Sequence, residues 1–196
     1  MSPAEPGRHA QVWVLRHGAT EWSVSGRHTG RTDLSLTADG EAQALALGRR
    51  LAGRPFARVL VSPLARARQT CALAGYGEVA EVDDDLQEWD YGRYEGITSA
   101  AIHEQVPDWT VWTGPCPDGE TIAQVAARAD RVIERALASD GDVALFAHGH
   151  LLRVVTARWC QLDPVEGRRF PLETATVNVL GWEHDVPGIC RWNDDA

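Results

Sequence analysis

The chain has 196 residues, a formal net charge of −9 at pH 7 and a hydrophobic content of 44%. These values are typical of a globular domain with a sizeable core, and the acidic balance argues against nucleic acid or an anionic membrane as a partner. All 19 cationic residues are arginine. The chain therefore cannot use a lysine for Schiff-base chemistry or for P-loop phosphate binding.

The cysteines and the N-terminal residues bear on the cellular compartment. Cys71, Cys116, Cys160 and Cys190 are widely spaced, which favours reduced thiols over a disulfide framework or a zinc site. Residues 1–10 are polar, lack the apolar core of a signal peptide and are expected to be flexible. No apolar run approaches the roughly 20 residues that span a bilayer, so we expect a cytoplasmic protein without a membrane partner.

The first predicted strand ends in residues suited to chemistry. Residues 12–15 form a short apolar run and are followed directly by Arg16, His17 and Gly18. This pattern predicts a buried strand that carries the arginine and the histidine to the edge of a sheet, where α/β proteins bind ligands. A glycine at position 18 would let a ligand approach the backbone closely. For this tripeptide alone, a strand followed by a solvated turn is the commoner explanation.

Residues 23–36 form a connection rich in glycine and threonine. Its hydroxyl and amide groups, including those of Ser23, Thr29 and Gly30, could line an anion site, although the composition fits a surface loop equally well. After this connection, Thr37 is a candidate N-cap for a helix that runs to about residue 51.

A second strand is predicted over residues 58–61, followed by a helix over residues 64–74. Ser62 is expected to cap this helix, with Pro63 at its first position. Arg66 lies in the first turn, where the helix dipole disfavours a cation, so we expect it to have an anionic partner. A solvated arginine is the alternative.

A third predicted strand at residues 79–82 leads into an acidic turn at residues 83–85, which we expect to be solvated. Beyond it, Glu88, Asp90 and Glu95 are interleaved with a tryptophan and two tyrosines. A carboxyl group beside aromatic rings can retain its proton, as a general acid must. Local composition leaves open which of the three carboxylates has this role.

A lid is predicted over the edge of the sheet. Residues 98–105 have the pattern of a short helix, and residues 107–119, with their tryptophans and prolines, favour an irregular segment. We therefore expect residues of about 86–120 to form a lid segment within one domain that spans residues 11–196, rather than a separate domain.

The last third of the chain contains the clearest strand. Apolar residues recur at helical spacing over residues 121–137 and indicate core packing only. Residues 143–147 predict a buried strand that ends in His148, Gly149 and His150. A histidine between a strand end and a helix N-terminus favours anion binding. A metal is disfavoured, because the further ligands that a metallohydrolase would need nearby are absent.

The order of elements predicts the architecture. A helix over residues 151–160 and late strands over residues 174–182 and 189–192 complete the alternation of strands and helices. We therefore expect an α/β fold, a three-layer α/β/α sandwich with a mostly parallel central sheet. Three junctions between a strand and a helix carry polar residues, and loops at one sheet edge can converge on one crevice.

Taken together, these motifs resemble the histidine phosphatase superfamily, which includes the cofactor-dependent phosphoglycerate mutases. The Arg-His-Gly sequence at residues 16–18, continued by residues 20–22, resembles the nucleophile motif of that family. Residues 62–67 resemble the segment with its second pocket arginine, Glu88 matches its general acid, and His148 its second pocket histidine. The four motifs occur in the expected order between about residues 12 and 150.

The resemblance implies a role for each matching residue. His17 would be the nucleophile that forms a phosphohistidine, and Glu88 would donate and accept the proton. The implied phosphate-binding residues are Arg16, Arg66, His148, Ser23, Thr29, Gly30 and Gly149. The resemblance implies neither a metal nor another cofactor, and a homodimer is its family-level expectation.

Within the superfamily, the sequence is most similar to acid phosphatases and sugar-phosphate phosphatases. Ser23 stands where mutases generally have asparagine, and the segment after Glu88 lacks the lysine and the paired arginines of mutases. We therefore expect a metal-independent phosphatase that hydrolyses small phosphomonoesters. A phosphoglycerate mutase is the alternative enzyme, and a non-catalytic phosphate-binding module is the alternative of another class.

Overall fold

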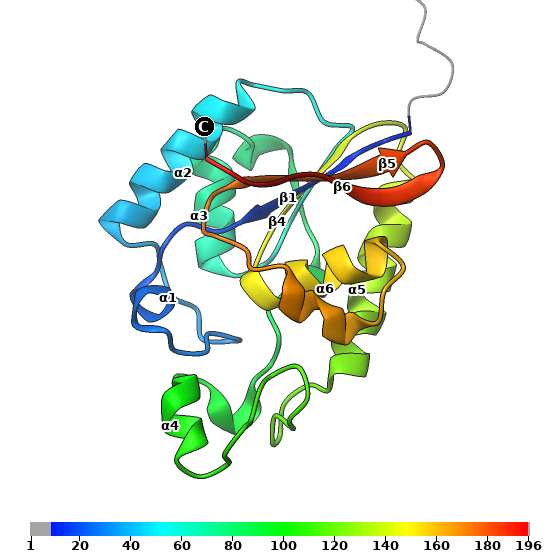
Figure 1. Ribbon diagram of the computed structural model, residues 1–196. Coiled ribbons are helices and arrows are strands. Elements are labelled where there is room, and N and C mark those ends of the chain that lie inside the picture. The colour runs from blue at the N-terminus through cyan, green and yellow to red at the C-terminus, as the bar shows by residue number, and fades with distance from the viewer. Residues whose placement is uncertain (1–8, 196) are drawn as a thin grey trace, which may run out of the picture.

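The computed structural model describes residues 9–195 as a six-stranded sheet with helices on both faces (Figure 1). This arrangement confirms the predicted α/β sandwich. Of the segment 1–10, which was predicted to be flexible, all but the last two residues lie outside the described residues.

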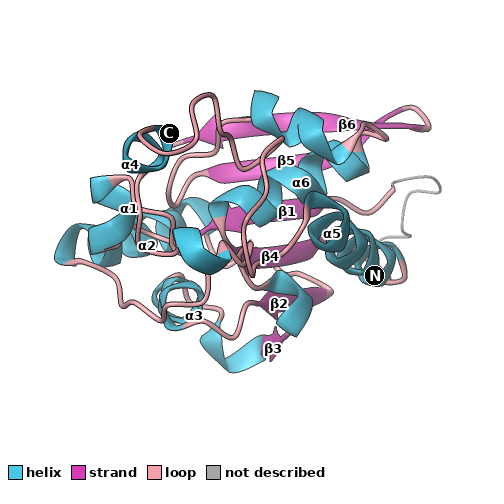
Figure 2. Cartoon of the chain, turned by 90° about the horizontal axis from the view of Figure 1, so that it is seen from below, coloured by secondary structure: helices cyan, strands magenta, loops and turns pink. Residues whose placement is uncertain are grey.

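The sheet is parallel over four strands and antiparallel over two. Its strands lie in the order β3-β2-β4-β1-β5-β6, which can be followed from bottom to top in Figure 2. The four parallel strands are β1 (Val12–Arg16), β2 (Arg58–Val61), β3 (Ala80–Val82) and β4 (Val143–Ala147). The hairpin of β5 (Val177–Glu183) and β6 (Val186–Asp194) pairs antiparallel with the other side of β1. The prediction of a mostly parallel sheet is therefore correct.

Alternating side chains of β1 enter two separate cores. Val12 and Val14 pack in the core that includes residues of α5 (Ile122–Leu137) and α6 (Gly149–Trp159). Trp13 and Leu15 point to the opposite face, whose core includes residues of α2 (Ala38–Leu51) and α3 (Ala65–Leu73). Because β1 is buried on both faces, it appears in the sequence as a continuous apolar run.

The shorter elements lie mainly in the loops at the carboxyl ends of the strands and in the predicted lid. They are α1 (Glu21–Ser25), η1 (Gly77–Val79), η2 (Asp84–Leu86), η3 (Gly92–Tyr94), α4 (Ser99–His103) and η4 (Pro164–Arg169). Helix α1 occupies part of a segment that was predicted to be a loop. Thr20 and Ser23 form a capping box at its start, a local signal that the sequence analysis missed.

Helix α3 begins later than predicted and has a different cap. Its first residue is Ala65, and its N-cap Leu64 offers no side-chain hydrogen bond. The carboxylate of Asp33 instead accepts a hydrogen bond from the amide of Ala65, at 2.7 Å. The expected cap, Ser62, accepts only a long bond of 3.3 Å from the amide of Leu64 and contacts the candidate site instead.

The acidic turn at residues 83–85 is solvated as predicted only at Asp84, which is exposed. Asp83 and Asp85 form ion pairs with Arg135 of α5, and Asp85 also pairs with Arg131. These pairs attach the turn that precedes the predicted lid segment to α5. They were invisible in the sequence because about 50 residues separate the partners.

Gly18 is needed for helix packing. A Cβ atom on Gly18 would lie 2.3 Å from the carbonyl oxygen of Gly40, near the start of α2. The glycine therefore permits close contact between the loop after β1 and α2, whereas the sequence analysis assigned it to ligand approach.

Two further expectations concern the described residues as a whole. The four cysteines are free thiols, as predicted. Within residues 9–195, no helix has both the length and the apolar composition needed to cross a membrane.

Helix α2 offers a matched test of the core. Leu47 is fully buried against the sheet, whereas Leu45 is 47% exposed on the same helix. We expect Leu47→Ala to lower the free energy of unfolding by about 2–5 kcal/mol, because it leaves a cavity in a packed core. Leu45→Ala should change it by less than about 1 kcal/mol. Urea unfolding of both variants measures the difference, and equal losses would contradict the described burial.

Candidate active site

A cleft of about 300 Å³ lies at the carboxyl ends of β1 and β4. It is lined by Arg16, His17, Ser23, Gly26, Arg27, His28, Thr29, Glu88, Tyr91, Ser99, Gly149, His150, Arg153 and Leu172. Six of the predicted site residues are among them: Arg16, His17, Ser23, Thr29, Glu88 and Gly149. The lining residues come from the end of β1, from α1 and the loop that follows it, from the predicted lid, from α6 and from the segment before β5.

His17 is held in a form suited to nucleophilic attack. Its Nδ1 lies 2.7 Å from the carbonyl oxygen of Gly18. Since a carbonyl oxygen only accepts, Nδ1 carries a proton, and the neutral ring has its lone pair on Nε2. Burial lowers the pKa of His17 well below its usual value, and the positive charges of Arg66 and Arg16 lower it further. The ring is therefore neutral and fixed in one tautomer.

Arg16 has an unused donor inside the site. Its Nη1 donates to the carbonyl oxygen of Leu172, at 2.5 Å, while its buried Nε has no hydrogen-bond partner among the described residues. Burial lowers the pKa of Arg16, although the nearby charges of Glu88 and Glu173 raise it. A buried N–H without an acceptor is costly, so this guanidinium is well suited to receive an anion.

Arg66 and His148 lie close to His17 but are not among the residues that line the cleft. Both are fully buried, and the ring centroids of His148 and His17 are 5.2 Å apart. Nε of Arg66 donates to Nδ1 of His148 at 3.1 Å, so the neutral His148 carries its proton on Nε2 and donates it to Oγ of Ser62 at 2.7 Å. Burial lowers the pKa of His148 well below its usual value, and Arg66 lowers it further.

The expected anionic partner of Arg66 is replaced by carbonyl groups. Its Nη atoms donate to the carbonyl oxygens of Thr29, Gly30 and Thr32, at 2.9–3.1 Å. Within residues 9–195, the guanidinium forms no ion pair. Four of its five N–H groups are therefore committed to protein acceptors, and one on Nη1 remains.

The structure separates the three carboxylates that the sequence left equivalent. Only Glu88 lines the cleft. Glu95 accepts hydrogen bonds from the amides of Gly30 and Thr32 and holds that loop. Asp90 pairs with Arg31 outside the cleft.

Glu88 is held by backbone amides. Its Oε1 accepts hydrogen bonds from the amides of Trp89 and Leu151, both at 2.9 Å. Its Oε2 accepts one from the amide of His150, at 3.0 Å. The immediate contacts of the carboxyl group are thus polar, rather than the aromatic surroundings expected from the sequence, and they fix its orientation beside the cleft.

The four remaining predicted residues differ in whether their hydrogen-bond donors are free to bind a ligand. The amide of Gly30 is already donated to Glu95, so it is not a free donor as predicted. The hydroxyl of Ser23 is engaged with the backbone of Thr20, and that of Thr29 with a backbone carbonyl. Gly149 begins α6, where backbone N–H groups lack intrahelical partners. A Cβ atom on Gly149 would lie 3.4 Å from Nε of Arg16.

Several residues of the site were not found from the sequence. Ser62 contacts His148, and Arg128 of α5 donates to the carbonyl oxygens of residues 85 and 87, next to Glu88. His150 and Arg153 line the cleft from α6. These last two residues are three positions apart in α6, and this spacing could have placed their side chains on one face of the helix.

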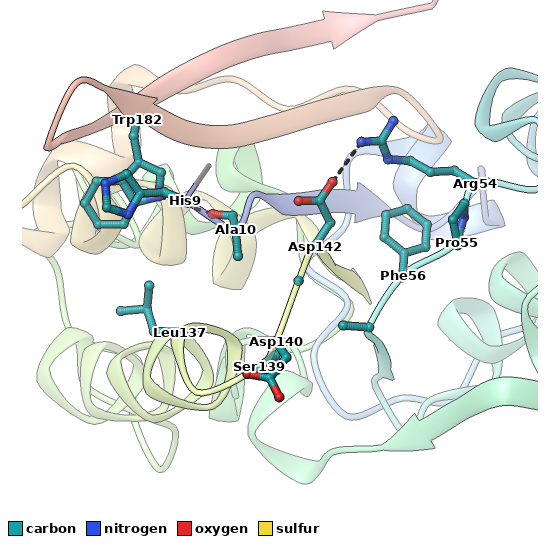
Figure 3. A pocket seen from close by; sticks show the side chains of 12 residues that line it. His9, Ala10, Arg54, Pro55, Phe56, Leu137, Ser139, Asp140, Asp142 and Trp182 are labelled. Atoms are coloured by element: carbon teal, nitrogen blue, oxygen red, sulfur yellow. Dashed lines mark hydrogen bonds and ion pairs between the residues drawn. The ribbon is translucent and has the colours of Figure 1, made fainter. Parts of the chain in front are cut away.

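A larger hollow of about 890 Å³ lies at the opposite end of the parallel strands (Figure 3). His9, which lines it, precedes β1; Phe56 precedes β2; and Asp142 precedes β4. Its arginine, Arg54, is paired with Asp142 at 2.8 Å. The hollow thus lies away from the predicted site residues. In the part of the chain that the structure describes, no group of three or more histidine, cysteine or acidic residues could hold a metal ion.

The buried histidines predict a pH-dependent stability. Burial lowers the pKa values of His17, His148 and His150 in the folded state, so below about pH 6.5 the unfolded chain binds more protons than the folded one. The free energy of unfolding should therefore fall between about pH 6.5 and 5, by up to about 1.4 kcal/mol per pH unit for each histidine. Urea unfolding across this range measures the slope.

Two variants control this prediction. His148→Gln should reduce the slope, whereas His184→Gln, at a side chain that is 87% exposed, should leave it unchanged. The same slope in wild type and His148→Gln would show that His148 is not kept neutral by burial.

Comparison with known proteins identifies the family of the chain. A profile of the histidine phosphatase superfamily (branch 1) matches residues 12–195. The chain is 46% identical over 183 residues to an acid phosphatase of Mycobacterium tuberculosis, which covers 91% of this chain and 90% of that protein. It is 38% identical over 178 residues to a sedoheptulose 1,7-bisphosphatase of Saccharomyces cerevisiae, covering 74% of this chain and 66% of that protein.

The fold comparison agrees with the sequence comparison. A solved structure of an open reading frame product from Mycobacterium tuberculosis superposes with a TM-score of 0.91 and 43% identity, covering 95% of this chain and 98% of that chain. With the profile match over nearly the whole described chain, these similarities decide the family. The chain belongs to the histidine phosphatase superfamily, branch 1, and is a phosphatase of the histidine phosphatase type.

Proposed function

We propose that the protein hydrolyses small phosphomonoesters without a metal or other cofactor, through a phosphohistidine on His17. The observation that carries this proposal is the state of His17. Its Nδ1 proton is held by the carbonyl of Gly18, and its pKa is lowered by burial and by Arg66 and Arg16. A neutral imidazole with its Nε2 lone pair free is the form that can attack phosphorus.

The arginines supply the charge that phosphoryl transfer requires. Arg16 binds the transferred phosphoryl group through its unpartnered Nε, and the amide of Gly149 adds a donor at the start of α6. Arg66 contributes its one uncommitted N–H and the positive field around His17. His148 contributes its Nε2 proton, which the phosphate takes over from Ser62. Charge on the equatorial oxygens is thus stabilised by fixed donors.

Glu88 acts as the general acid and then as the general base. Its carboxyl group lies in the cleft and is oriented by three backbone amides. It donates a proton to the leaving oxygen when the phosphohistidine forms, and it then takes a proton from the water that hydrolyses this intermediate. Such a general acid and base typically contributes about 10²–10⁴-fold to the rate.

His17→Ala tests the nucleophile. We expect hydrolysis of a panel of phosphomonoesters by the wild type to survive EDTA, and kcat to fall by about 10⁴-fold or more in the variant, which lacks the attacking nitrogen. Phosphate release measures both. Activity that is retained in His17→Ala would contradict the mechanism, and activity that EDTA abolishes would contradict metal independence.

Glu88→Gln tests the proton donor through the leaving group. With an alkyl phosphate, whose leaving oxygen needs a proton, kcat should fall by about 10²–10⁴-fold. With p-nitrophenyl phosphate, whose leaving group departs without a proton, formation of the intermediate should be affected far less. The burst of p-nitrophenol in the first turnover separates this step from the later attack of water. Equal losses in this step for the two substrates would rule out Glu88 as the acid.

The two alternative functions give different results in the same assays. A phosphoglycerate mutase would interconvert 2- and 3-phosphoglycerate faster than it hydrolyses them once bisphosphoglycerate is added. A non-catalytic phosphate-binding module would release no phosphate and would keep its full function in His17→Ala.

The remaining features follow from the same proposal. The substrate is a small phosphorylated metabolite, and the protein acts in the cytoplasm, where free thiols such as the four described cysteines persist. Residues 11–196 act as one domain whose segment 86–120 covers the cleft as a lid. A homodimer is the family-level expectation.

A further inference from the structure

The cleft carries more positive charge than one phosphate group requires. Its lining includes three arginines, Arg16, Arg27 and Arg153, but a single carboxylate, Glu88. The charges that act on the proposed nucleophile are those of Arg66 and Arg16. Two arginines of the cleft, Arg27 and Arg153, are therefore left without a role in phosphoryl transfer.

Arg153 is fixed by three contacts from two segments of the chain. Its Nε donates to the carbonyl oxygen of Gly167 at 3.0 Å, and its Nη2 to that of Arg168 at 2.9 Å. Its guanidinium carbon lies 4.7 Å from the ring centroid of Trp112. Across residues 9–195, Nη1 donates to no acceptor. The guanidinium plane is thus oriented in advance, and three N–H groups, two on Nη1 and one on Nη2, are left for a ligand.

The electrostatic surroundings of Arg153 favour an anion. Burial lowers its pKa, and Arg16 lowers it further, although Glu88 raises it. Two partly desolvated guanidinium groups therefore lie within range of mutual repulsion. A negatively charged group bound beside them in the cleft would offset the free-energy cost of their desolvation and mutual repulsion.

Arg27 extends the positive charge to the exposed end of the cleft. Its side chain is exposed, and in the described part of the chain its guanidinium has no hydrogen-bond acceptor. The wall beside it adds no negative charge, because burial raises the pKa of Tyr91 well above its usual value and so keeps its phenol protonated, while a histidine such as His28 is neutral or positive. The part of the cleft beyond Arg16 is therefore neutral or positive, except at Glu88.

We propose that Arg153, with Arg27 nearer to solvent, forms a second anion subsite that selects phosphomonoesters whose leaving group carries a second anionic group. This inference rests on the proposed function, because it describes the leaving group of that reaction. A carboxylate or a second phosphate group satisfies the same two guanidinium groups, since both present paired oxygens to a planar donor.

Two matched pairs of substrates test the subsite. 3-Phosphoglycerate differs from glycerol 3-phosphate by a carboxylate in place of a hydroxymethyl group, and fructose 1,6-bisphosphate differs from fructose 6-phosphate by a second phosphate. For at least one pair, wild type should favour the more anionic member in kcat/KM. Preference within the first pair indicates a carboxylate, and preference within the second pair a phosphate.

Three variants test which arginine produces this substrate preference. Arg153→Gln should reduce it by about 10- to 100-fold, the usual effect of losing hydrogen bonds to a charged group. The change should appear in KM for the more anionic substrate and should be larger than any change for the less anionic one. Arg27→Gln, at an exposed side chain, should reduce the preference less. Arg49→Gln, at an exposed residue of α2, removes the same charge and should leave the preference unchanged.

Three results would contradict the subsite. Wild type that hydrolyses both members of each pair with equal kcat/KM has no such selectivity. Equal losses on both members in Arg153→Gln, with an unchanged preference in Arg27→Gln, would make Arg153 a structural residue. If Arg49→Gln lost as much of the substrate preference as Arg153→Gln, the preference would be due to the overall charge of the protein. Failure of wild type to hydrolyse any of the four substrates would instead contradict the proposed function, and this inference with it.

Discussion

The buried guanidinium of Arg66 is the constraint on which the rest of the site depends. A fully buried cation is costly unless its donors are satisfied, and here three backbone carbonyls and the imidazole of His148 accept its hydrogen bonds. These bonds fix the loop at residues 29–32 against α3. They also set the tautomer of His148. Because no carboxylate within residues 9–195 forms an ion pair with Arg66, its positive charge lowers the pKa of His17 and helps to keep that imidazole neutral.

Local patterns were sufficient to predict the strands and most helices, and long-range contacts were not. The run before Arg16 and the helical stripe of α5 are properties of neighbouring residues, so the sequence indicates them directly. The cap that Asp33 provides for α3 and the pairing of Asp83 with Arg135 join distant residues. They depend on the fold, and no local signal specifies them.

The same distinction applies to the candidate site. The strand-end pattern correctly placed Arg16 and His17 at the sheet edge. The family resemblance selected Glu88, the one of the three carboxylates in its segment that lines the cleft. The sequence could not show which hydrogen-bond donors of the site are already engaged by other protein groups. Gly30 gives its amide to a glutamate from the predicted lid. The first turns of α6 contribute to the site at three positions. Gly149 lies beside Arg16, the amide of His150 donates a hydrogen bond to Glu88, and Arg153 lines the cleft.

The register of the sheet has a consequence for biosynthesis. Strand β1, which ends directly before His17, pairs on one side with residues 143–147 and on the other with residues 178–180. More than 120 residues lie between the end of β1 at Arg16 and the start of β4 at Val143, and β5 follows later still. This apolar strand therefore leaves the ribosome long before either of its partners. The central pairings form after long loop closure, which slows folding and gives chaperones time to bind the nascent chain.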